Sequence, residues 1–98
     1  MLRHVVLLRW KPEIPADQVE AITAALQALP AVVPEIRAYS CGPDLGLSGD
    51  ANSTYAIVAD FDDEVGWQAY DTHPEHQSVR ADLIRPWLAA RTAAQFTL

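Results

Sequence analysis

The chain has 98 residues, of which 50% are hydrophobic and 20% are charged, a composition typical of one globular domain. Asp and Glu number 13 against 7 Lys and Arg, and the resulting net charge of −6 argues against partners such as nucleic acid or anionic membranes. No apolar run approaches the length of a membrane span, and Cys41 has no second cysteine for a disulfide. We therefore expect a single domain over 1–98, located in the cytoplasm.

The first half of the chain predicts a strand, a helix and a second strand. The alternation in 3–10 places one titratable side chain, His4, on a face with Val6, Leu8 and Trp10. The helix that follows has apolar residues at spacings of three and four and ends before Pro30; its stripe comprises Val19, Ile22, Leu26 and Leu29. A short strand is expected at 36–41, followed by a loop rich in Gly, Asp and Ser at 42–53.

The second half predicts a strand, two helices and a last strand. The strand at 54–61 is apolar on both faces, and its inner face would carry Tyr55, Ile57, Ala59 and Phe61. Acidic residues open a short helix through Tyr70, where the helix dipole favours negative charge. A further helix begins at Pro74 and runs to about residue 85, and 92–98 closes the chain as a strand.

This order of elements predicts an α+β fold of the ferredoxin-like split βαβ type, a four-stranded antiparallel sheet with helices on one face. The strands at 3–10 and 54–61 are apolar on both faces, yet the helices can cover only one of them. A second copy of the chain is the simplest cover for the other face. We therefore expect a homodimer, a dimeric α+β barrel.

Three titratable side chains lie on otherwise apolar faces, so that His4, Tyr70 and His76 should converge between sheet and helices. His76 is the third residue of its helix, where the positive helix end and the apolar surroundings should both lower its pKa. A neutral imidazole is suited to general-base catalysis, and Tyr70 could hydrogen-bond a substrate carbonyl and stabilise an enolate. The structural alternative is that these side chains are satisfied polar groups of the core.

The remaining candidates are weaker. His73 adjoins the start of a helix, where a capping role is expected. The three histidines do not match known zinc-ligand spacings, and Cys41 has no activating partner, so neither a metal nor a cofactor is expected. Trp10, Trp67 and Trp87 are expected by default to be core residues, although three indoles around one pocket would suit a small apolar or aromatic ligand.

Four segments in combination resemble the stress-responsive A/B barrel (Dabb) family across essentially the whole chain: Arg-His-Val-Val-Leu-Leu-Arg-Trp-Lys at 3–11, Val-Pro-Glu-Ile at 33–36, Tyr-Ala-Ile-Val at 55–58 and Tyr-Asp-Thr-His-Pro-Glu-His at 70–76. The resemblance implies a dimeric α+β barrel. It also implies an activity like that of the olivetolic acid cyclase-type polyketide cyclases, with His76 and Tyr70 as catalytic residues and His4 beside them. Implied substrate-binding positions are Ile22, Leu26, Ile57, Ala59, Phe61, Trp67, His73 and Trp87, His73 being the structural histidine of the motif. Gln95 departs from the family pattern, which commonly has Asp there.

Three functions follow from these observations. The first is a cofactor-independent cyclase that closes a ring in a poly-β-ketoacyl substrate by an aldol reaction. The second is a non-catalytic, stress-responsive or small-ligand-binding dimer, in which loss of His76 would change stability only. The third is a monooxygenase activity, cofactor-free or haem-handling, of the kind known on related barrels; a spectral shift on adding haemin would support it.

Overall fold

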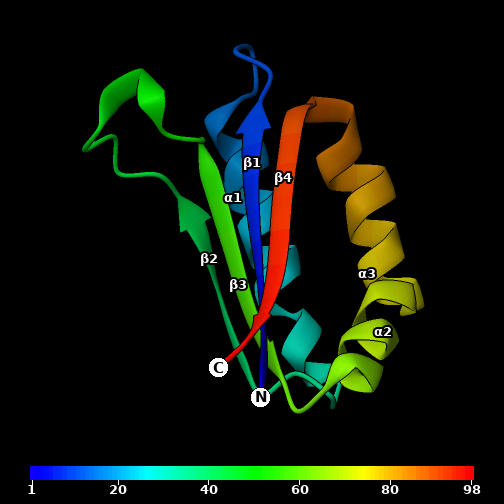
Figure 1. The fold of residues 1–98 in the computed structure, drawn as a ribbon. Helices are drawn as coiled ribbons and strands as arrows, with labels where there is room; N and C mark the ends of the chain where they lie inside the picture. Colours follow the sequence, from blue (N-terminus) through cyan, green and yellow to red (C-terminus); the bar gives the residue numbers. More distant parts are fainter.

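Four antiparallel strands form one sheet in the order β2-β3-β1-β4 in the computed structural model, which describes residues 1–98 (Figure 1). The strands are β1 (Leu2–Trp10), β2 (Ala38–Pro43), β3 (Tyr55–Phe61) and β4 (Leu88–Thr97). The two central strands, β1 and β3, are the two that the sequence marks as apolar on both faces. This topology confirms the predicted ferredoxin-like plan.

The helices cover one face of this sheet (Figure 1). They are α1 (Ala16–Gln27), α2 (Glu64–Thr72) and α3 (Pro74–Ser78), with short 3-10 turns at Leu29–Ala31 and Gly49–Ala51. The carboxylate of Asp63 caps α2 by accepting a hydrogen bond from the Gly66 amide at 3.0 Å. Pro74 occupies the first turn of α3, as its fixed φ predicts. None of the helices has the length and apolar character that crossing a bilayer requires.

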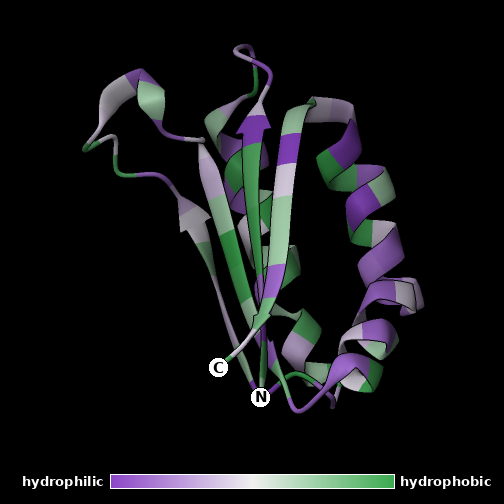
Figure 2. Cartoon of the chain, in the orientation of Figure 1, coloured by the Kyte–Doolittle hydropathy of each residue, from purple (hydrophilic) through white to green (hydrophobic).

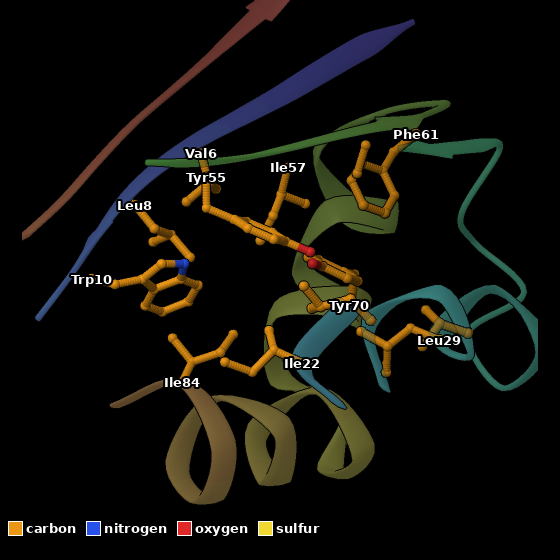
Figure 3. Close-up of a cluster of buried hydrophobic side chains, with 13 residues drawn as sticks. Val6, Leu8, Trp10, Ile22, Leu29, Tyr55, Ile57, Phe61, Tyr70 and Ile84 are labelled. Carbon is orange, nitrogen blue, oxygen red and sulfur yellow. The ribbon is translucent and has the colours of Figure 1, made fainter. Parts of the chain in front are cut away.

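The core lies between the sheet and the helices (Figure 3). Along β1 every second side chain from His4 to Trp10 is buried, and along β3 the same holds from Tyr55 to Phe61. The strand faces predicted from alternation are therefore confirmed. Ile22 and Leu26 of α1 close the core from the helical side.

The opposite face of the sheet carries no helix. Leu7 is 40% exposed there and Phe96, paired across the ladder with Arg3, is 50% exposed. Hydrophobic residues run along the central strands in Figure 2. One buried charge lies on this face, the Asp60 carboxylate, which accepts two hydrogen bonds from Arg3 at 2.8 and 2.9 Å.

The helix expected from Pro74 to about residue 85 is wrong in its geometry. After α3 the chain continues as a π-helix, Val79–Ile84, and a 3-10 turn, Arg85–Trp87. The wider π turn changes which positions face inward: Ile84 is buried, whereas Leu83, which α-helical spacing places inside, is only half-buried. Nothing in Val79–Ile84 marks the change, since the segment contains neither Gly nor Pro.

Two strand boundaries also differ from the prediction. The strand expected at 36–41 begins at Ala38, because the Ile36 amide closes a turn onto the Val33 carbonyl, and it extends through Pro43. The strand expected at 92–98 begins at Leu88, where it pairs with Trp10 of β1. Its first residues include two alanines, which have low strand propensity and therefore conceal it.

Candidate active site

A cavity of about 210 Å³ lies between the sheet and the helical column that runs from α3 to β4. Hydrophobic side chains make up 7 of its 13 lining residues: Val6, Leu8, Leu26, Ile57, Tyr70, Ile84 and Leu88. The polar members are His4, Asp71, His76, Arg80, Arg85 and Arg91. The predicted convergence of His4, Tyr70 and His76 is thus present. An apolar wall with a few polar groups is the usual character of a small-molecule site.

His76 is held in one orientation by the residue six positions before it. Its Nδ1 lies 2.9 Å from the Tyr70 carbonyl oxygen, and its ring stacks on the Tyr70 ring with centroids 3.9 Å apart. A carbonyl only accepts, so Nδ1 carries the hydrogen and Nε2 keeps a lone pair. Burial, assisted by Arg80, lowers the pKa of His76 to about 4. The neutral base expected from the sequence is present, with burial as the main cause.

Tyr70 is 1% exposed, near the end of α2. Its hydroxyl lies 2.9 Å from that of Tyr39 and points towards the hydroxyl of Tyr55 (Figure 3). Burial raises the pKa of Tyr70 to about 12, against the opposing effect of the Tyr39 hydrogen bond. The phenol is therefore neutral at pH 7. When Tyr39 donates to Tyr70, the hydrogen of Tyr70 remains available to another acceptor.

His4 has the opposite tautomer. The Gln95 side-chain amide donates to His4 Nδ1 at 2.8 Å, so the hydrogen of the neutral ring is on Nε2. Burial lowers the pKa of His4, and the Arg91 charge lowers it further. His4 therefore offers a donor where His76 offers an acceptor. One cavity thus contains a base and a neutral hydrogen-bond donor.

Arg80 and Asp71 form the ion pair of the cavity wall. The Arg80 guanidinium lies 3.0 Å from the Asp71 carboxylate and donates to the Asp71 backbone carbonyl at 2.7 Å. The pair ties the end of α2 to the π-helix. Its positive member disfavours protonation of His76, whose pKa it lowers.

Only two of the eight substrate-binding positions implied by the resemblance, Leu26 and Ile57, line the cavity. Ile22, Ala59 and Phe61 are buried in the core. His73 caps α3, its Nδ1 accepting from the Glu75 amide at 3.1 Å, as its position in the sequence suggested.

The tryptophans also lie elsewhere. Trp67 borders a second hollow, beside β4, and its ring centroid is 6.0 Å from that of His4. Trp10 is part of the core, and Trp87 is half-buried outside the cavity lining. The three indoles therefore do not surround one pocket, and Trp10 is a core residue, as expected by default.

Several residues that shape the site were not singled out from the sequence. Tyr39 and Gln95 bond Tyr70 and His4 across 31 and 91 positions, so no local pattern indicates them. The departure at Gln95 from the commoner Asp was the only available signal. The three arginines reach the cavity because of the π-helix and because β4 begins at Leu88, and the sequence predicted neither feature.

No group of three or more His, Cys, Asp or Glu side chains is placed to hold a metal ion. Cys41 is half-buried on β2. The histidines of the cavity are instead bonded to a carbonyl and an amide.

A comparison with models of protein families identifies the family of this chain. Residues 2–98 match the model of the Stress Responsive A/B Barrel Domain. The chain belongs to this family. A search of curated proteins found no match to this A/B barrel protein.

Solved structures similar to this A/B barrel protein share its fold over nearly its whole length. A dimeric ferredoxin-like protein of unknown function from Thermobifida fusca is 46% identical, with a TM-score of 0.90 over 99% of this chain and 90% of that one. The hydroxynitrile lyase from Passiflora edulis is 20% identical, with a TM-score of 0.85 over 99% and 92%. A putative antibiotic biosynthesis monooxygenase from Chloroflexus aurantiacus is 19% identical, with a TM-score of 0.73 over 100% and 93%.

Proposed function

We propose that this A/B barrel protein is a polyketide cyclase-like enzyme that closes a ring in a poly-β-ketoacyl substrate. The observation that carries the proposal is the pair of histidines with opposite tautomers on one apolar cavity. The Tyr70 carbonyl leaves Nε2 of His76 as a base, and Gln95 leaves Nε2–H of His4 as a donor. Carbon–carbon bond formation through an enolate requires both groups.

In the proposed mechanism His76 Nε2 removes a proton from the methylene between two carbonyls of the substrate. The enolate carbon attacks a third, more distant carbonyl of the same substrate, and the resulting alkoxide takes the proton back from the His76 imidazolium. His4 and the Tyr70 hydroxyl donate hydrogen bonds to the oxygens that carry negative charge. A histidine pKa of about 4 makes His76 a weak base, which suits a methylene activated by two carbonyls rather than one.

The size of the cavity limits the ring. A cavity of roughly 150 Å³ in another protein holds benzene, so about 210 Å³ accommodates a single ring with short substituents. The apolar side chains of the wall reduce the contact between the enolate and water. The proposed product is therefore a small monocyclic compound, not a fused polycycle.

The proposal can be tested by coupling the protein to a polyketide synthase that makes a linear tetraketide-CoA. Native protein should divert lactone by-products to a ring-closed product, whereas His76→Ala and Tyr70→Phe should not. Gln77→Ala, an exposed neighbour of His76 on α3, is the matched control and should behave as native. Deuterium exchange at the methylene of acetoacetyl-CoA tests the proton transfer alone. Exchange in native protein that survives His76→Ala would contradict the mechanism.

A second candidate function is a ligand-binding protein without catalysis. The Tyr70 hydroxyl supports it, because it is buried and already bonded to Tyr39. In that case acetoacetyl-CoA would show no exchange, and Tyr70→Phe would change stability but not the chemistry of any substrate.

We also propose that the chain forms a homodimer through the uncovered face of the sheet. Leu7 and Phe96 are exposed on this face, and the Thermobifida fusca relative is described as dimeric. Light scattering should give twice the 10.8 kDa mass of one chain. A Phe96→Asp variant should shift the mass to that of one chain. A native protein that is monomeric at micromolar concentration would refute the interface.

A further inference from the structure

Nearly half of the basic residues of this acidic protein line one cavity. Of the seven Lys and Arg residues, three line it: Arg80, Arg85 and Arg91. Asp71 is the one acidic residue of the lining, and it is paired with Arg80. With both histidines neutral, three positive charges and one negative charge leave an excess of two positive charges. The net charge of the whole chain is −6, so the cavity opposes the sign of the molecule around it.

Two of these arginines have no partner in the protein. The arginines away from the cavity are bonded: Arg3 to Asp60 at 2.8 Å, Arg37 to Asp62 at 2.8 Å, and Arg9 to the Asn52 carbonyl at 2.7 Å. The guanidinium groups of Arg85 and Arg91 make no hydrogen bond or ion pair in the structure, and only the backbones of these two residues are bonded. A chain with 13 acidic residues supplies neither of them with a carboxylate.

Arg85 and Arg91 reach the cavity from different elements. Arg85 opens the 3-10 turn after the π-helix. Arg91 pairs with the buried Leu8 across the β1–β4 ladder, so its side chain is on the helical side of the sheet. The helical column runs beside β4 (Figure 1). Both arginines are exposed, which places them at the mouth, while His4 and His76 are buried deeper.

We propose that Arg85 and Arg91 form an anion-binding subsite at the mouth of the cavity. Its ligand is a carboxylate or phosphate group on a small molecule whose carbonyl-bearing part extends inward to His4 and His76. This orientation rests on the function proposed above; the anion subsite itself does not. Guanidinium groups match both anions geometrically, and two of them at one opening favour a negatively charged molecule over its neutral analogue. The anion is either the carboxylate of an aromatic acid or a phosphate of a coenzyme A thioester.

Binding of 2,4-dihydroxybenzoate and of neutral 2,4-dihydroxybenzamide, followed by tryptophan fluorescence, tests the subsite. Native protein should bind the acid at least tenfold more tightly than the amide, and the preference should weaken with salt. Arg85→Gln and Arg91→Gln should each weaken binding of the acid about tenfold and leave the amide unchanged. Arg37→Gln removes the same charge away from the cavity and should have no effect.

Adenosine 3′,5′-bisphosphate separates the two sources of the anion. Competition by this nucleotide, lost in the double arginine variant, identifies a phosphate; tight binding of the benzoate alone identifies a carboxylate. Equal binding of acid and amide with no binding of the nucleotide overturns the subsite, as does a preference that survives the double variant. If anion binding follows the arginines while acetoacetyl-CoA shows no exchange, the subsite stands and the cyclase function falls.

Discussion

The buried state of His76 predicts how stability depends on pH. The unfolded chain binds a proton at this histidine near pH 6.5, whereas the native protein binds it only near pH 4. Between these values the unfolded state holds more protons, so the native state loses stability as the pH falls through this window. The neutral His76→Gln variant removes this contribution, and its amide can still donate to the Tyr70 carbonyl.

The magnitude follows from the same two values. Each pKa unit corresponds to about 1.4 kcal/mol, which sets an upper limit of about 3.5 kcal/mol. Because the ring borders a cavity that water can enter, we expect about 2 kcal/mol. Urea unfolding of native and variant protein at pH 7 and pH 4 measures this contribution to the free energy of unfolding. The contributions of the carboxylates are common to both proteins and cancel when the two pH dependences are subtracted.

The expected result is that native protein loses about 2 kcal/mol more than His76→Gln between the two pH values. Titration of the His76 ring by NMR provides an independent measurement. A midpoint near pH 6.5, or equal losses in the two proteins, would refute the reasoning that burial keeps His76 neutral.

Three further predictions concern the packing of the π-helix, the tautomer of His4 and the uncovered face of the sheet. Ile84→Ala should destabilise the protein by about 2–5 kcal/mol in urea unfolding and Leu83→Ala by clearly less; the reverse order would contradict the π turn. Gln95→Asp should raise the pKa of His4, because a carboxylate stabilises imidazolium, and move the neutral tautomer to Nδ1–H; unchanged ¹⁵N shifts of the ring would contradict this. Phe96→Asp should lower the mass in sedimentation equilibrium while far-ultraviolet circular dichroism stays native.

Alternation and spacing were sufficient to predict the sheet, the helical layer and the three central residues of the site. His4 could be placed because its neighbours two positions apart on β1 are apolar, and His76 because Pro74 fixes the start of its helix. These signals are local, because each depends only on the hydrophobic periodicity of the strand or helix that contains the residue.

The hydrogen bonds that fix the donor and acceptor roles of the cavity residues could not be predicted from such local patterns. Gln95 determines the tautomer of His4 from the far end of the chain, and Tyr39 bonds Tyr70 from another strand. Most of the substrate-binding positions implied by the resemblance do not line the cavity; Phe61 and Trp67, for example, are packed outside it. Side-chain packing, not backbone topology, decides which residues a ligand can touch.

The π turn has an evolutionary consequence. The π-helix closes each hydrogen bond over one residue more than an α-helix does, so Val79–Ile84 holds about one residue more than an α-helix would need for the same rotation. A deletion of one codon within it would restore the α-helical pitch and leave Arg85 facing the cavity, while His76, which precedes the segment, would keep its bond to Tyr70. The same deletion within α1 would rotate the residues that follow it by about 100° about the helix axis. This segment therefore tolerates a change of length that the regular helix does not.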